Sequence, residues 1–509
     1  MWDSWYYTFM KQRSFDAIVI GSGFGGAASA YRLARAGMKT LLLERGNWAK
    51  RDELDWDQRE ILINNRYESS SRMKVKQYGE DSFKEMAPRE VVGGMSVFYG
   101  GASLRLREKD FNSWPISYDD LEPYYSEAEQ VLEVHGEAGG DRFEPPRSSE
   151  YPFPGISLSP PAARISSAAR GLGYTPFKIP LALNFRNDQR TVCIKCITCD
   201  GFPCKIQAKN DVTMTFMAGV QDRDFEVMPG VIVDRLVEKC GRIQSVMCIE
   251  TESRHAFSLS ARVIVLSAGA IGSPALLLRS DLERFGGHRW VGKCLMRHCN
   301  AVVSALFPFR TNPGKVFHKQ ICLTDFYEDL RDKYQTSVGT IQDIYTPSAE
   351  VLRHFAPKRY KGIVSLSSKF LQNLLCIAED DPREVNAVTL SGEKDVFGMP
   401  LVQVEHRYSF ADYERRDLLI NRAKAVLGKA GGLIKRHYEI DSFSHAVGSV
   451  RFGNDPGESA LDRDCRFREV DNLFVVDGSF MPTSGGVNPS LTIAANALRV
   501  GEIIQKEFA

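Results

Sequence analysis

The stretch of sequence that decides the fold is residues 15–46, FDAIVIGSGFGGAASAYRLARAGMKTLLLERG. Residues 15–20 form an apolar run that is long enough for a buried strand and too short for a helix. After a glycine-rich turn, residues 27–36 predict a helix rich in small side chains, and residues 40–43 predict a second strand that leads into Glu44. This order of strand, glycine turn, helix, strand and acid predicts a βαβ unit that binds a dinucleotide.

Three glycines at GxGxxG spacing, Gly21, Gly23 and Gly26, have separate physical tasks in such a unit. Gly21 makes the tight turn, Gly23 lets the backbone approach a pyrophosphate, and Gly26 lets the helix pack closely on the strand. The phosphates are expected at the helix N-terminus, where free N–H groups and the helix dipole favour anions. Glu44 lies 18 residues after Gly26, near the spacing of about 20 for an acid that holds a ribose hydroxyl. The motif alone leaves NAD, FAD and an ordinary tight turn open.

Length and composition indicate a globular protein of two or more domains. The chain has 509 residues, 43% of them hydrophobic and 25% charged, and its net charge of +1 provides no broad field for nucleic acid or an anionic membrane. No apolar run reaches the length of about 18 residues that a membrane span needs, and the first residues lack the pattern of a secretory signal. Eleven cysteines, an odd and mostly scattered set, favour a reducing compartment, so we expect a cytoplasmic protein.

Four later segments carry small residues next to apolar runs. Residues 91–101, VVGGMSVFYGG, predict a loop whose backbone passes close to a flat ligand, or a plain glycine-rich turn. Residues 262–274 repeat the order of strand, small-residue turn and helix, and residues 472–477 form a short strand closed by an acid. In residues 484–492 a proline begins a helix, where its missing N–H costs nothing.

The middle of the chain has a different pattern. Alternating segments at 301–307, 362–368 and 401–407 predict strands of an antiparallel sheet, which we assign to a second, substrate-covering domain.

Four cysteines, at 193, 196, 199 and 204, form the one clustered set. Their spacing, C-x2-C-x2-C-x4-C, departs from the bacterial iron–sulfur run C-x2-C-x2-C-x3-C-P. An iron–sulfur cluster or zinc held by Cys193, Cys196, Cys199 and Cys204 competes with disulfides and with free thiols that only shape a loop. The loop interpretation is slightly favoured, so no metal is assigned.

Seven segments, in this order, resemble the glucose–methanol–choline (GMC) family of FAD oxidoreductases over nearly the whole chain. They are GSGFGG with Glu44, VVGGMSVFYGGASLR, WPISYDDLEPYY, VLSAGAIGSPALLL, VGKCLMRH, SHAVGS and VVDGSFMPTSGGVNPSLTIAANALRVGE. The resemblance implies an α/β fold in which a Rossmann-like FAD-binding domain is interrupted by a substrate domain with a mainly antiparallel β-sheet. We expect the FAD-binding domain at 1–114, 204–299 and 440–509, and the substrate domain at 115–203 and 300–439.

The same resemblance implies FAD rather than NAD and oxidation of a CH–OH group. His445 falls on the family's active-site histidine and Asn488 on its partner. A neutral imidazole is suited to take the hydroxyl proton while a hydride passes to flavin N5, so we expect His445 to be the base and Asn488 to hold the substrate oxygen. A lone histidine is more often structural, so the catalytic role of His445 is expected from the resemblance alone.

The motifs and the resemblance together predict the residues that contact the cofactor. They are Gly21, Gly23, Phe24, Gly25, Gly26, Glu44, Arg45, Gly94, Met95, Ser96, Val97, Val233, Ala268, Gly269, Asp477, Gly478, Asn488, Pro489 and Ser490. Some pyranose and glycoside oxidases, which this chain resembles most, carry a histidine in the GMS-containing loop that bonds covalently to the flavin. The loop has no histidine here, so non-covalent FAD is expected.

The leading functional prediction is oxidation of a sugar or glycoside, at a ring secondary hydroxyl that becomes a ketone. Two alternatives stay open: oxidation of a primary alcohol of an aminosugar in antibiotic biosynthesis, and a flavin electron-transfer subunit whose partner does the chemistry. Oxygen or another acceptor would reoxidise the flavin, and the sequence does not indicate the number of subunits.

Overall fold

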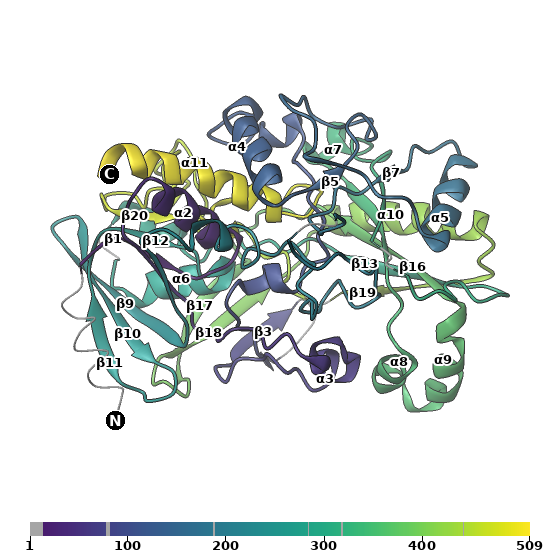
Figure 1. The fold of residues 1–509 in the computed structure, drawn as a ribbon, viewed down its shortest axis with the longest axis horizontal. Coiled ribbons are helices and arrows are strands. Elements are labelled where there is room, and N and C mark those ends of the chain that lie inside the picture. The colour runs from purple at the N-terminus through teal and green to yellow at the C-terminus, as the bar shows by residue number, and fades with distance from the viewer. Residues whose placement is uncertain (1–13, 78–81, 187–188, 283–284, 317–318, 441) are drawn as a thin grey trace.

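A parallel sheet forms one end of the molecule in this computed structural model, which describes residues 14–77, 82–186, 189–282, 285–316, 319–440 and 442–509. Its strand order is β20-β12-β1-β2-β8 (Figure 1). The strands are β1 (Phe15–Ile20), β2 (Thr40–Leu43), β8 (Phe225–Met228), β12 (Ala261–Leu266) and β20 (Leu473–Val475). All pairs are parallel, as expected for a sheet built from βαβ units.

Helices and a small antiparallel sheet surround these strands. Helix α2 (Phe24–Arg35) packs against α11 (Ser490–Phe508), and α11 also packs against α4 (Tyr118–Val131). The second sheet has the order β11-β10-β9, and α6 packs on β9. Their bounds are β9 (Val231–Lys239), β10 (Arg242–Glu250), β11 (Ala256–Leu259) and α6 (Gly269–Arg279). Ser117 caps α4, because its side chain accepts a hydrogen bond from the Asp120 N–H.

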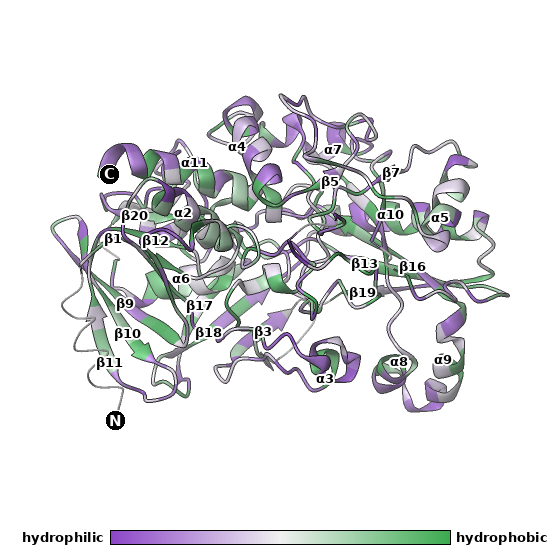
Figure 2. Ribbon diagram, viewed as in Figure 1, coloured by the Kyte–Doolittle hydropathy of each residue, from purple (hydrophilic) through white to green (hydrophobic). Residues whose placement is uncertain are grey.

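The other end of the molecule is built on a six-stranded antiparallel sheet of order β19-β13-β16-β15-β14-β7. Its strands are β7 (Phe177–Lys178), β13 (Ala301–Leu306), β14 (Ile321–Leu323), β15 (Gly339–Ile344), β16 (Leu371–Ala378) and β19 (Ile434–Glu439). Helices α10 (Phe410–Lys429) and α5 (Pro160–Arg170) share a buried core with these strands. Figure 2 shows hydrophobic residues on the strands of this sheet and a mixture of hydrophobic and hydrophilic residues on α5. The α/β class with an antiparallel second sheet is therefore confirmed.

Two strand predictions in the middle of the chain need correction. Residues 362–368 were expected to be a strand and instead belong to helix α9 (Lys361–Ser367) and the turn after it. Residues 401–407 do form a strand, β18 (Pro400–His406), but it lies in a separate four-stranded sheet, where it pairs in parallel with β3 (Met73–Gln77). That sheet is completed by β17 (Ala387–Lys394) and β4 (Lys84–Met86).

Short elements connect the sheets. They are α3 (Gln58–Leu62), β5 (His135–Gly136), β6 (Phe153–Pro154), α7 (Arg331–Tyr334) and α8 (Ala349–Phe355). Among the helices described, not one combines the length and the apolar character needed to cross a bilayer.

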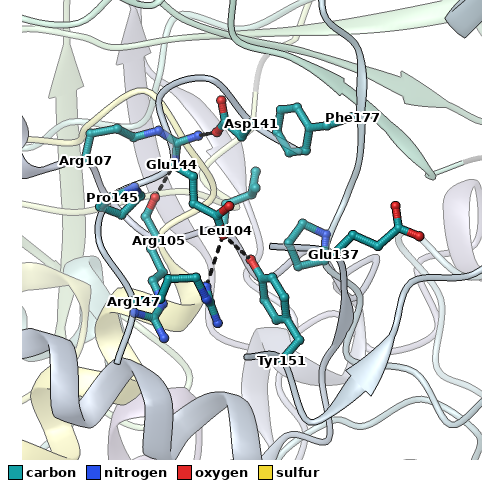
Figure 3. A pocket seen from close by; sticks show the side chains of 11 residues that line it. Leu104, Arg105, Arg107, Glu137, Asp141, Glu144, Pro145, Arg147, Tyr151 and Phe177 are labelled. Carbon is teal, nitrogen blue, oxygen red and sulfur yellow. Dashed lines mark hydrogen bonds and ion pairs between the residues drawn. The ribbon is translucent and has the colours of Figure 1, made fainter. Parts of the chain in front are cut away.

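A buried ionic network fixes α4 against the segment that follows residues 91–101, which we call the second glycine-rich loop. The guanidinium of Arg105 donates to Glu129 at 2.8 and 2.7 Å and to Glu122 at 2.8 Å. Arg147 also donates to Glu129. Beside this network lies a cavity of about 10 Å³, which has room for roughly one water molecule (Figure 3). Its charges are mutually paired, so we regard this cavity as structural.

Removing one member of this network should destabilise the fold strongly. Arg105→Met leaves the buried Glu129 with a single cation, and breaking a buried pair costs about 3–5 kcal/mol of unfolding free energy. Lys506→Met removes a pair whose lysine side chain is 71% exposed, and its expected cost is about 0–1 kcal/mol. Urea unfolding of both variants measures the difference, and equal midpoints would show that the Arg105 network does not stabilise the fold.

Candidate active site

The GxGxxG turn is packed so tightly that side chains would not fit at three of its glycines. A Cβ on Gly26 would lie 1.9 Å from the Gly21 carbonyl oxygen, and one on Gly21 would lie 2.3 Å from the Ser267 carbonyl oxygen. Gly21 also has φ of +96°, which an L side chain rarely adopts. A Cβ on Gly25 would lie 2.4 Å from the Val476 carbonyl oxygen. These glycines hold the start of α2 directly against the ends of the neighbouring strands.

Gly23 is different, because its surroundings are open. A Cβ placed there would meet no heavy atom within 4 Å, and Gly23 is the N-cap of α2 with no side chain capping the helix. The first N–H groups of a helix are free to bind an anion in that situation. Next to it the Phe24 ring lies edge-on to Tyr99, with 5.1 Å between the ring centroids. The turn thus has the form of a phosphate cradle.

Glu44 lies directly beside this cradle. Its carboxylate accepts hydrogen bonds from the Ser22 hydroxyl and from the N–H groups of Ser22 and Gly46, at 3.1 and 2.8 Å for the two N–H groups. Burial raises its pKa, and these hydrogen bonds oppose the shift. The next residue, Arg45, forms an ion pair with Glu90 at 2.8 Å.

The second glycine-rich loop lies against the first. The Gly93 N–H donates to the Ser22 hydroxyl at 2.8 Å, and a Cβ on Gly94 would lie 3.2 Å from the Gly23 Cα. In the same loop the Met95 side chain is 43% exposed. Ser96 and Val97 serve the packing of the loop: the Ser96 hydroxyl donates to the Gly93 carbonyl, and the Val97 carbonyl accepts from Lys209.

Asp477 connects the ends of β20 and β12. Its carboxylate accepts from the Gly269 N–H at 3.1 Å, from the Ser479 N–H at 2.8 Å and from the Ser273 hydroxyl. Burial raises its pKa. Ala268 is the N-cap of α6, and its N–H donates to the Ser273 hydroxyl.

The remaining predicted cofactor residues lie in three places. Val233 lies on β9, where its carbonyl accepts from Arg279 at 3.3 Å. Pro489 is the N-cap of α11, and Ser490 begins that helix. The Gly478 carbonyl accepts from the Gly448 N–H, which places Gly478 beside the strand segment that follows His445.

His445 and Asn488, which lie 43 residues apart in sequence, meet in the folded chain. Their Nε2 and Nδ2 atoms are 3.4 Å apart. The Asn488 side-chain oxygen accepts from the Gln342 amide at 2.8 Å, so its NH2 group is the one that faces His445. The structure therefore brings together the two residues that were expected to be catalytic.

His298 contacts the opposite side of the His445 ring. The two Nδ1 atoms are 2.9 Å apart, and Nε2 of His298 lies 2.9 Å from the Gly485 carbonyl and 3.2 Å from the Ser484 carbonyl. Because carbonyl oxygens only accept, Nε2 of His298 carries a proton and its Nδ1 is the acceptor for His445. His445 must then carry its proton on Nδ1, which leaves Nε2 unprotonated, with its lone pair facing the NH2 group of Asn488 at 3.4 Å.

Backbone contacts hold His298 in this position. Met296 and Val447 exchange two hydrogen bonds of 2.9 Å, which set the two histidine segments side by side. Asp380 accepts from the N–H groups of Arg297 and His298, at 2.8 and 3.0 Å. His298 has φ of +62°, an unfavourable conformation that these contacts maintain.

The electrostatic environment keeps His445 neutral. Burial lowers its pKa well below the ordinary 6.5, and the positive charge of Lys319, together with that of His298 when His298 is protonated, lowers it further. Lys319 is itself buried and paired with Asp200 at 2.9 Å. An imidazole in this setting is unprotonated at neutral pH and can accept a proton at Nε2.

His298, Gln342 and Lys319 were not predicted as site residues. His298 lies in the VGKCLMRH segment, so the motif that indicates the family also contained this signal. Gln342 and Lys319 are 146 and 126 residues from their partners Asn488 and His445, and nothing local in the sequence indicates either contact.

All four clustered cysteines are free thiols in the structure. Across the part of the chain that is described, no three His, Cys, Asp or Glu side chains are placed to hold a metal ion. Burial raises the pKa of Cys193 to about 11 and that of Cys199 well above its usual range. The carbonyls of Cys199 and Phe202 accept from Lys209, which also bonds Val97, so this segment supports the second glycine-rich loop. A metal or cluster on these cysteines stays a prediction.

Comparison with known proteins identifies the family of the chain. GMC oxidoreductase family models match residues 15–300 and 382–497. A 6'''-hydroxyparomomycin C oxidase from Streptomyces lividus is 32% identical, and the match covers 98% of this chain and 92% of the relative. A paromamine 6'-oxidase from Streptomyces fradiae is 30% identical over 98% and 93% of the two chains.

Solved structures extend the likeness to the fold. A pyridoxine 4-oxidase from Mesorbium loti has a TM-score of 0.69 at 18% identity, with 96% of this chain and 99% of that chain covered. A formate oxidase from Aspergillus oryzae has a TM-score of 0.66 at 14% identity, with 98% and 99% covered. The family expected from the sequence is thereby confirmed: the chain belongs to the GMC oxidoreductases, enzymes that act on CH–OH donors.

Proposed function

We propose that the protein is an FAD-dependent enzyme that oxidises a CH–OH group of a sugar or glycoside, with His445 as the base. The observation that carries the proposal is the arrangement of His445, Asn488 and His298, which leaves one unprotonated imidazole nitrogen next to a carboxamide donor. A carbinol carbon loses hydride readily only while its hydroxyl proton is being removed. The Nε2 atom of His445 is available for that proton, and the Asn488 NH2 group can donate to the same oxygen.

The residues at the strand ends fit FAD. The open space at Gly23 and the uncapped start of α2 suit a pyrophosphate, and the carboxylate of Glu44 next to them suits a ribose hydroxyl. Gly94 and Met95 would lie along the ring system. FAD held there supplies a two-electron acceptor for the substrate hydride. We propose that it is bound without a covalent link, because the loop offers no histidine.

The side chain of Gln342 is evidence for a substrate with more than one hydroxyl. Its side-chain oxygen is buried, and among the described residues it has no hydrogen-bond partner. A buried acceptor without a partner is costly, and a substrate hydroxyl next to the one that reacts would satisfy it. This property favours a sugar over a simple alcohol.

The position that is oxidised has two candidates. A ring secondary hydroxyl that becomes a ketone is our first proposal. The second is the primary hydroxyl of an aminosugar, and it is favoured by the names of the two relatives at 30–32% identity, a paromamine 6'-oxidase and a 6'''-hydroxyparomomycin C oxidase. For both candidates, oxygen or another acceptor would regenerate the oxidised cofactor.

Anaerobic reduction of FAD-loaded protein tests the proposal. Methyl glucoside or paromamine should bleach the flavin absorbance, and identification of the product as a ketone or an aldehyde distinguishes the two candidates. His445→Ala should slow the bleaching by about 10²–10⁴-fold, the usual contribution of a general base. Unchanged bleaching in that variant would contradict the role of His445, and a wild-type protein that stays oxidised with every sugar would contradict the substrate class.

The cofactor site can be tested separately at Gly23. Gly23→Ala has space for the methyl group, so the unfolding free energy of the cofactor-free protein should stay within about 0.5 kcal/mol of wild type. The affinity for FAD should fall at least about tenfold, because the methyl group occupies the cradle. Gly392→Ala, which also meets no atom within 4 Å, is the matched control and should change neither quantity. Fluorescence titration with FAD measures the affinity, and a wild-type affinity in Gly23→Ala would place the phosphates elsewhere.

A third experiment tests whether His298 sets the tautomer of His445. His298→Ala removes the acceptor, so flavin reduction should slow by about 10- to 100-fold, because part of the His445 population then carries its proton on Nε2. At acidic pH, where His298 itself takes up a proton, the variant also lacks the positive charge that lowers the His445 pKa, so the acidic fall in rate should move to higher pH.

His298→Asn is the matched variant, because its side-chain oxygen can still accept from His445 and asparagine tolerates positive φ. It should keep most of the rate, and its acidic fall in rate should move to higher pH as in His298→Ala, because asparagine carries no charge either. If both variants lose rate equally with no change in the pH profile, His298 is merely structural.

A further inference from the structure

A helical hairpin projects from the end of the molecule that carries the antiparallel sheet. It lies between β15 and β16 and consists of α8 and α9, which pack on each other at the lower right of Figure 1. It contacts the rest of the protein at its two ends. At its start the Ser348 N–H donates to Gln58 and Arg59 pairs with Glu350. At its end the carbonyls of Lys369 and Phe370 accept from backbone N–H groups of the segment after β13. We call residues 349–370 the hairpin.

The hairpin buries almost nothing against the protein. Val351 is buried, but every residue from 352 to 370 is at least partly exposed, and all of them lie in the described part of the chain. Large apolar side chains are among the most exposed, with Phe355 at 67%, Ile363 at 69% and Leu366 at 79%. Ile363 and Leu366 are three residues apart on α9 and share one side of it. Figure 2 shows hydrophobic and hydrophilic bands on both helices.

The charges of the hairpin are almost all positive. Its cations are Arg353, Lys358, Arg359, Lys361 and Lys369. Its one acid, Glu350, is paired with Arg59 at 2.7 Å. The whole protein has a net charge of only +1, so this surface differs sharply from the average.

We propose that the hairpin docks the protein on an anionic phospholipid surface, with Phe355, Ile363 and Leu366 inserted among the acyl chains. Basic side chains beside exposed large apolar ones form the pattern of helices that lie in a membrane interface. Cations near such a surface are attracted to its anionic headgroups, and the apolar side chains leave water. The proposal is independent of the substrate and of the role of His445.

The structure favours lipid over the other occupants of such a surface. An isolated helix of seven residues is not stable in water, and α9 has no buried residue to hold it, so it gains most from an interface that receives its apolar side. A second copy of this chain would bring the same positive charges against these, which is unfavourable. An acidic protein would satisfy the cations but not the three exposed apolar side chains.

Vesicle co-sedimentation of the full-length FAD-loaded protein tests the proposal. Vesicles of phosphatidylcholine with about one third phosphatidylglycerol should bind the protein, and vesicles of phosphatidylcholine alone should bind it at least about tenfold less. Two variants should each lower binding to the anionic vesicles at least about tenfold: Ile363→Asp with Leu366→Asp, and Lys358→Glu with Arg359→Glu. Hydrogen exchange on anionic vesicles should show new protection confined to residues 352–370.

Matched controls separate the hairpin from general surface effects. Phe410→Asp removes an aromatic side chain that is 80% exposed in the first turn of α10, and Arg142→Glu with Lys394→Glu makes the same charge change at exposed positions elsewhere. Both controls should bind like wild type, and flavin reduction should be unchanged in all four variants. The proposal is overturned if wild type does not bind the anionic vesicles, if the hairpin variants bind as wild type does, or if protection appears outside the hairpin. Formation of dimers that the apolar variant abolishes, without vesicle binding, would assign the surface to a second copy.

Discussion

The structure depends on a backbone contact that excludes side chains. Gly21 and Gly25 let the turn and the start of α2 touch the carbonyl groups that follow β12 and β20, and Gly26 lets the helix touch the carbonyl of Gly21. That contact seats the N-terminus of α2 at the carboxyl ends of the parallel strands. In an open α/β sheet this edge is where ligands bind, and here β2 and β20 end next to Glu44 and Asp477. A substitution at one of these glycines would therefore disturb every group that the edge brings together.

Backbone hydrogen bonds also hold the two segments that carry His298 and His445. The hydrogen bonds between Met296 and Val447, and those from the chain at 297 and 298 to Asp380, bring two histidines of distant segments into contact. Two backbone carbonyls accept from Nε2 of His298 and thereby place its proton on that atom. Nδ1 of His298 is then an acceptor, which places the proton of His445 on its own Nδ1. The tautomer of the proposed base is thus set by the fold, whereas burial and neighbouring charge keep it neutral.

The sequence predicts the parts of this molecule that are encoded locally. The GxGxxG turn, the strands beside it and the helix that follows it are predicted from residue type and spacing, and all are present. The pairing of His445 with Asn488 was predicted from the resemblance to the family and not from local sequence. Contacts such as Gln342 with Asn488 join segments far apart, and no local pattern encodes them. At 362–368 the short run GIVSLSS fits a strand or a helix, and with no sheet edge beside it the helix forms.

Average charge conceals how this surface is organised. A net charge of +1 argues against any membrane attraction for the whole chain, yet cations collect on one hairpin whose apolar side chains face water. That hairpin interrupts the antiparallel sheet without altering it, because β15 and β16 pair from Gly339 with Ala378 to Ile344 with Asn373. Gln342 lies inside this paired region and the hairpin lies beyond it. The pairing of β15 with β16 therefore separates the hairpin from the proposed substrate site. Substitutions on the hairpin can change the surface of the protein while the groups around His445 stay in place.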